Sequence, residues 1–198
     1  MTWLILITLV VGIFSGPFLP ESLVSSLDGI TTFALCLLIF GIGIDLGRER
    51  QVLSCLRKEG VTALVIPLLV AVGSLAGTYL YSFFSTFSST EAVAVGAGFG
   101  WYSLTGPLLS QLHSAKLGAV GFLANTFREL ISIVIIPLVA KKLGHWAAIA
   151  PSGAAAMDVT LPLITRATDP ETAVLAFVSG VVLSLLVPIV VPLIIQLG

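Results

Sequence analysis

Long apolar runs separated by short polar connections cover almost the whole chain. A helix needs about 20 mostly apolar residues to cross a bilayer. Five runs meet this requirement, at residues 2–20, 28–46, 60–84, 117–140 and 171–196. The pattern therefore predicts an all-α membrane protein that forms a single transmembrane domain over residues 1–198.

Two further apolar stretches, residues 91–112 and 145–165, are interrupted by glycine and proline where a helix would otherwise continue. Broken backbone at membrane depth is tolerated where it packs on protein or lines a water-filled cavity. We expect both stretches to dip into the membrane and return, which gives five transmembrane helices plus two re-entrant segments. Seven full crossings are the alternative, because they leave the two chain ends on the same sides.

The two interrupted stretches resemble each other at an offset of 55 residues. The matching pairs are Gly98 and Gly153, Thr105 and Thr160, Pro107 and Pro162, and Pro137 and Pro192. Each repeat, residues 91–143 and 146–198, would hold one broken segment and one span. It would cross the membrane an odd number of times, so the two would point in opposite directions. This predicts the inverted repeat of many secondary transporters, preceded by three spans in residues 1–90.

The composition agrees with a membrane location and argues against several classes of function. Of the 198 residues, 57% are hydrophobic and 10% are charged, which is more apolar surface than a soluble domain of this size can bury. A net charge of −1 argues against nucleic acid as a partner. The sequence has no nucleotide-binding loop and no cysteine spacing typical of a metal site. We expect a protein that is not an enzyme and that uses no cofactor or metal.

The basic residues predict the orientation of the chain. Four of the nine Lys and Arg residues lie in the loop at 47–59, which the positive-inside rule places in the cytoplasm. The N-terminus is then inside, and the connection at 85–90 and the C-terminus are outside. The re-entrant arrangement also places Lys141 and Lys142 inside, as the same rule prefers.

Asp158 lies just past the second interruption and is the strongest candidate for a transport residue. A carboxylate at membrane depth costs several kcal/mol unless it faces a cavity or a partner. The small residues Gly153 to Ala156 before it would let a substrate approach closely. We expect Asp158, with Thr160 beside it, to contact a cationic substrate; the alternative is that Asp158 only caps a half-helix.

Arg128 and Glu129 lie near the middle of a predicted span. Adjacent helical residues point about 100° apart, so these two cannot pair across one face. Glu129 shares a face with Asn125 and Ser132, a stripe that suggests the wall of a pathway. The charges of Arg128, Glu129 and Asp158 sum to −1, which favours a cationic substrate whose carboxylate Arg128 would hold. A structural ion pair between helices is the alternative.

Several other polar residues lie beside the breaks or at the membrane edge. Trp101 and Tyr102 follow the first break, where they would receive an ammonium group or anchor the chain at the interface. Ser103 and Thr105 come next and are candidate binding residues. Asp45, at the cytoplasmic end of the second span, is a candidate gate or an interfacial residue. Its depth argues against an intramembrane aspartyl protease, which needs both acids at one level.

These residues resemble those of the lysine exporter family LysO. The similarity rests on four segments, which are residues 98–106, 128–130, 157–162 and 184–188. It implies a secondary-active exporter of L-lysine and of lysine-like toxic analogues, in a bacterial or archaeal cytoplasmic (inner) membrane, with the proton gradient as driving force. In the family, Asp158 corresponds to a functional intramembrane acid.

The resemblance also implies a partner. Full-length members carry an additional N-terminal portion of about three spans, and some members occur as a small and a large protein. This chain resembles the large one, so we expect a small subunit of about three spans, or further copies of the chain, to complete the carrier. A carrier for another cation or amino acid and a non-transporting subunit are the alternatives.

Overall fold

The computed structural model describes residues 60–197 continuously and only isolated positions before them. Those positions are residues 7, 11, 14, 15, 29, 30, 33, 34, 36, 37, 40, 41 and 44. The chain divides into two compact units, residues 1–40 and 41–198, and the arrangement below is that of the second unit. Asp45 and most of the predicted spans at 2–20 and 28–46 lie outside the described residues.

Every regular element in the described part of the chain is a helix, as the hydrophobic pattern predicted. Within residues 60–197, three helices are long and apolar enough to cross a membrane. They are α4 (Val61–Ser82), α7 (Ala115–Leu143) and α9 (Pro170–Leu197). Their bounds agree within three residues with the predicted spans at 60–84, 117–140 and 171–196, because the length of an apolar run largely sets the length of the helix.

Local sequence signals fix the ends of the long helices. The Ser114 hydroxyl accepts a hydrogen bond from the Leu117 N–H at the start of α7, and Gly144 ends the helix with a φ of +97°. Lys141 and Lys142 lie in the last turn, where their charge complements the helix dipole. At the start of α9, the Asp169 carboxylate accepts from the Thr172 N–H.

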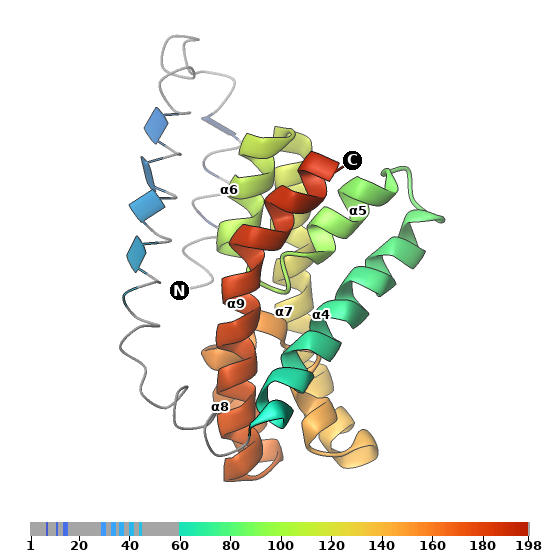
Figure 1. The fold of residues 1–198 in the computed structure, drawn as a ribbon, viewed down its shortest axis with the longest axis vertical. Coiled ribbons are helices and arrows are strands. Elements are labelled where there is room, and N and C mark those ends of the chain that lie inside the picture. Colours follow the sequence, from blue (N-terminus) through green and yellow to red (C-terminus); the bar gives the residue numbers. More distant parts are fainter. Residues whose placement is uncertain are drawn as a thin grey trace. The chain divides into compact units, whose positions relative to one another are not determined.

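Both interrupted stretches are broken in the structure. The first consists of α5 (Ser89–Gly96) and α6 (Tyr102–Leu112), and the second of the 3₁₀ turns η2 (Trp146–Ile149) and η3 (Gly153–Met157) and of α8 (Leu161–Ala167). In Figure 1 the start of α5 and the end of α6 both lie toward the end of the bundle that holds the C-terminus. α8 runs toward the opposite end, where α9 begins.

The two breaks touch each other through their backbones. The Ala154 N–H donates to the Phe99 carbonyl over 2.8 Å. Gly153 has a φ of +60°, and a Cβ placed on it would lie 2.0 Å from the Phe99 oxygen. Only glycine combines this left-handed conformation with so close an approach. The breaks at residues 97–101 and 153–158 therefore form one junction rather than two separate kinks.

Candidate functional site

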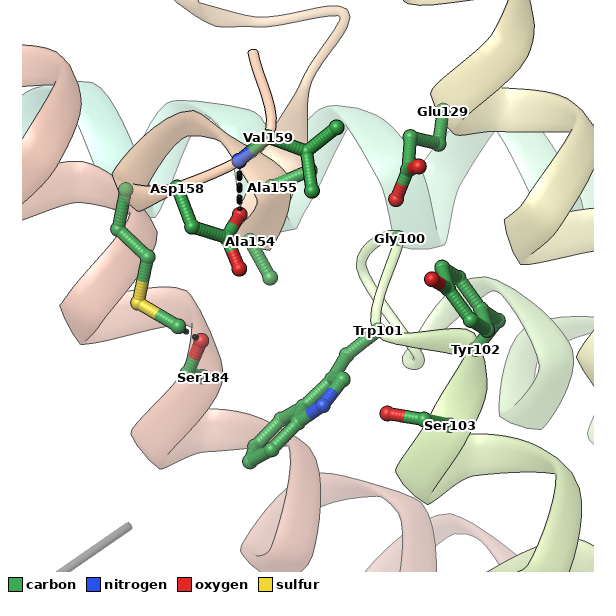
Figure 2. Close-up of a pocket in the computed structure, with 11 residues that line it drawn as sticks. Gly100, Trp101, Tyr102, Ser103, Glu129, Ala154, Ala155, Asp158, Val159 and Ser184 are labelled. Carbon is green, nitrogen blue, oxygen red and sulfur yellow. Dashed lines mark hydrogen bonds between the residues drawn. The ribbon is translucent and has the colours of Figure 1, made fainter. Parts of the chain in front are cut away.

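A cavity of about 80 Å³ lies beside the junction of the two breaks. It is lined by residues of both breaks and of the two long helices α7 and α9. They are Gly100, Trp101, Tyr102, Ser103, Glu129, Ala154, Ala155, Met157, Asp158, Val159 and Ser184. In Figure 2, Glu129, Tyr102 and Ser103 lie on one side of the cavity and Asp158 and Ser184 on the other. The two carboxylates and the Ser103 hydroxyl point into the space between these sides.

Glu129 is the most deeply buried charged residue at the cavity. Its residue surface is only 3% exposed, and within residues 60–197 no group hydrogen-bonds to its carboxylate. It belongs to the buried face of α7, which also includes Asn125 and Ser132. The shared face that the sequence indicated is therefore present, and Glu129 is the member of it that reaches the cavity. A buried carboxylate without a partner is costly in a site of low dielectric constant, so it favours binding of a cation.

Asp158 lies across the same cavity from Glu129 (Figure 2). Unlike Glu129, Asp158 is exposed, so the cavity is closed around Glu129 and open at Asp158. Its carboxylate accepts a hydrogen bond from the Val159 N–H. It does not cap α8, because that helix begins at Leu161 and its N-cap residue is Thr160. The capping alternative for Asp158 was therefore wrong.

The start of α6 forms another part of the cavity wall. Trp101 is the N-cap residue of this helix and makes no side-chain capping bond, while Tyr102 and Ser103 line the cavity in the first helical turn. The Tyr102 ring packs edge-to-face on Phe122, with the ring centroids 5.5 Å apart. The positive end of a helix dipole attracts negative charge. The cavity thus presents groups suited to both ends of a zwitterion.

Three of the predicted binding residues hold the breaks in place instead of lining the cavity. Asn125 accepts from the Gly100 N–H over 2.7 Å and donates to the carbonyls of Val95 and Gly121. The hydroxyls of Thr105 and Thr160 donate to backbone carbonyls of their own breaks, at Trp101 and Ala155 respectively. All three side chains are buried.

Arg128 points away from the cavity that its neighbour Glu129 lines. Its guanidinium donates to the carbonyls of Ala150 and Pro151 and to the Ser74 hydroxyl, at 2.9 to 3.2 Å. It also lines a separate, mostly apolar groove of about 800 Å³ between α4 and α7. Among the described residues no carboxylate pairs with it, so the structural ion pair that we considered for Arg128 is not observed there.

Ser184 lines the cavity and was missed as a candidate, because it lies in the apolar run of α9. The signal that points to it is the repeat offset, since Ser184 follows Glu129 by 55 residues. The same offset relates further members of the lining to each other. These pairs are Gly100 and Ala155, Tyr102 and Met157, Ser103 and Asp158, and Glu129 and Ser184.

Comparison with known proteins identifies the family of this chain. The family model described as "Lysine exporter LysO" matches residues 6–195. The chain belongs to the LysO family. It is 35% identical over 161 residues to "Lysine exporter LysO" of Escherichia coli (strain K12), and the match covers 80% of this chain and 52% of that protein. It is 33% identical over 168 residues to "Putative lysine exporter" of Haemophilus influenzae (strain ATCC 51907 / DSM 11121 / KW20 / Rd), with 82% of each chain covered. No solved structure matches the chain.

Membership in the LysO family, together with three apolar helices of sufficient length, identifies a multi-pass membrane protein of a transporter family. The LysO family takes its name from lysine export, which is transport and not an enzymatic reaction. The chain spans about half the length of the E. coli relative.

Proposed function

We propose that this chain forms the translocation pathway of a secondary-active exporter of L-lysine and similar cationic amino acids. The observation that carries the proposal is the pair of carboxylates in one cavity, with Glu129 buried and without a hydrogen-bond partner among the described residues, and Asp158 opposite it. Two negative groups that share a site of low dielectric constant repel each other, and a cation between them relieves the repulsion. A substrate ammonium group would supply that cation.

The surrounding groups suit the rest of a lysine molecule. The positive end of the α6 dipole would hold the substrate carboxylate. Trp101 and Tyr102 offer aromatic faces to an ammonium group. Arg128 was predicted to hold the substrate carboxylate. Its bonds to the Ala150 and Pro151 carbonyls favour instead a supporting role at the second break.

We infer that residues 91–143 and 146–198 form an inverted repeat with two re-entrant segments. The 55-residue offset relates four pairs of cavity residues, and it relates the two threonines that bond back to their own breaks. The positions of α5, α6 and α8 along the bundle favour the re-entrant arrangement over seven crossings. Rocking of one repeat against the other about the junction would expose the cavity alternately to the two sides.

Proton coupling would use the same two acids. A proton that enters from the outer side would neutralise Asp158 or Glu129, weaken the hold on the ammonium group and release lysine outward. The cycle then needs no nucleotide. We expect the chain to lie in a cytoplasmic (inner) membrane with its N-terminus inside and its C-terminus outside.

The resemblance to the LysO family suggested a partner for this chain, and the match covers 52% of the E. coli relative. We propose that a small subunit of about three spans or a second copy of the chain completes the carrier. Lysine transport by the purified chain alone, compared with transport after co-expression of the candidate partner, tests this point.

The decisive experiment replaces Asp158 by Asn, which keeps the size of the side chain and removes its charge. Lysine efflux is measured in proteoliposomes under an imposed pH gradient. Glu171→Gln is the matched control, because it removes an exposed acid of α9 that does not line the cavity. We expect Asp158→Asn to abolish efflux while Glu171→Gln keeps it. Efflux by Asp158→Asn at the wild-type rate would refute the role of Asp158.

The cavity volume raises a second possibility for the substrate, which is a cation smaller than lysine. Its 80 Å³ holds about two or three water molecules, which suits an ammonium group or a small amino acid better than a complete lysine molecule. A wider cavity in the loaded state, or a smaller cationic substrate, would follow from this. Efflux of lysine measured beside a panel of amino acids and monovalent cations separates the two possibilities.

A further inference from the structure

Ser184 is a polar residue whose place in α9 is not explained by packing alone. It is flanked by Leu183 and Leu185 and is only 1% exposed, yet it lines the cavity. Its hydroxyl donates to the Gly180 carbonyl over 2.9 Å, and the Met157 sulfur lies 3.7 Å away. A hydroxyl has one proton and two acceptor lone pairs. Because the Gly180 bond takes the proton, the lone pairs of Oγ stay available to a positively charged group.

The repeat offset sets Ser184 in relation to the acids. Ser184 corresponds to Glu129, and Ser103 corresponds to Asp158, each across 55 residues. All four residues line the same cavity, with Ser103 at the start of α6, Asp158 in the second break, and Glu129 and Ser184 on the long helices. Each repeat thus contributes one acid and one hydroxyl. At each pair of corresponding positions, one repeat has the acid and the other has the hydroxyl. The site combines the charge of two carboxylates with two neutral oxygen ligands.

We propose that the Ser184 hydroxyl oxygen is a ligand of the transported cation, on the same side of the cavity as Asp158 and opposite Glu129 (Figure 2). The proposal rests on the function proposed above, since it assigns a ligand to the same site. Ser184 Oγ accepts a hydrogen bond from the substrate ammonium group while the two acids neutralise its charge. An ammonium group has three N–H donors, so Glu129, Asp158 and Ser184 together would satisfy all three.

Ser179 provides a matched control on the same helix. It is fully buried, like Ser184, but it does not line the cavity. Its hydroxyl has no hydrogen-bond partner within the described residues. Removing the Ser179 hydroxyl therefore tests the general cost of losing a buried serine from α9 without touching the cavity.

The test measures lysine binding to the purified full chain in detergent by isothermal titration calorimetry. Ser184→Ala removes the oxygen, and Ser184→Cys removes it while filling the same space. Both variants should weaken lysine binding about tenfold, the scale of a hydrogen bond to a charged group. Ser179→Ala should bind within about twofold of wild type. The Cys variant keeps the experiment decisive if Ser184→Ala does not fold, which size-exclusion chromatography reveals.

The outcomes distinguish the proposed function from the role of Ser184 as a ligand. If wild-type protein binds lysine neither alone nor after co-expression with the candidate partner, the proposed function fails. If wild type binds lysine and Ser184→Cys binds it equally well, the function stands and Ser184 is not a ligand. If Ser179→Ala weakens binding as much as Ser184→Cys, the effect belongs to α9 packing and the assignment is again overturned.

Discussion

At the scale of single residues, Gly153 determines how closely the two breaks approach. Replacement by Ala would place a Cβ 2.0 Å from the Phe99 oxygen and would force a left-handed backbone on a residue with a side chain. The left-handed conformation alone costs about 1–2 kcal/mol, and loss of the Ala154 to Phe99 hydrogen bond adds about 1 kcal/mol. We expect Gly153→Ala to lower the melting temperature by several degrees and to reduce lysine binding.

Gly144 supplies the control for this prediction. It also has a positive φ, +97°, but nothing lies within 4 Å of a Cβ placed on it. Gly144→Ala should therefore show only the cost of the backbone conformation. Equal losses of thermal stability in the two variants, measured by differential scanning fluorimetry, would mean that the close approach of the breaks contributes nothing.

Residue roles were predictable from the sequence only where local geometry decides them. The 100° step between adjacent helical positions already separated Arg128 from Glu129, and the structure directs them to different surroundings. In contrast, no local signal distinguishes Asn125, which holds the first break, from a cavity residue. Asn125 lies close enough to the first break to accept a hydrogen bond from the Gly100 N–H. This closeness is set by the tertiary packing of α7 and not by the local sequence.

At the scale of helices, the start of α9 makes stability dependent on pH. The Thr172 N–H and, next in strength, the His145 side chain hydrogen-bond to the Asp169 carboxylate and lower its pKa to about 2. An unfolded Asp titrates near pH 3.9, so the stabilisation is complete above about pH 4 and is lost as the pH falls toward 2. The melting-temperature difference between wild type and Asp169→Asn should shrink over this range. A difference that stays constant down to pH 2 would contradict the prediction.

The helices themselves were the most predictable part of the fold. The apolar runs located α4, α7 and α9 within three residues, and glycine and proline marked both breaks. The 3₁₀ form of η2 and η3 was not predictable, because their short turns depend on bonds from other elements. One such bond joins the Ala154 N–H to the Phe99 carbonyl, between residues far apart in the sequence.

At the scale of the whole molecule, residues 91–143 and 146–198 line one cavity together. Glu129 and Ser103 come from the first segment, and Asp158 and Ser184 come from the second. The sequence similarity at an offset of 55 residues predicted that the two segments are related, but it carried no information about their contact. The hydrogen bond between the Ala154 N–H and the Phe99 carbonyl joins the two breaks, and the cavity lies beside this junction.

The membrane topology supplies the remaining test. Five spans with two re-entrant segments place Ser114 outside and Lys142 inside, whereas seven full crossings place Ser114 inside and Lys142 outside. Single cysteines are introduced at these positions after Cys36 and Cys55 are replaced by Ser. They are then probed in intact cells with a membrane-impermeant maleimide.

We expect labelling at Ser114→Cys and at a cysteine in the 85–90 connection, and none at Lys142→Cys until the membrane is permeabilised. The 85–90 site is the control, because both arrangements place it outside. Labelling of Lys142→Cys in intact cells would establish seven crossings, and the two repeats could then no longer rock as a pair of re-entrant units.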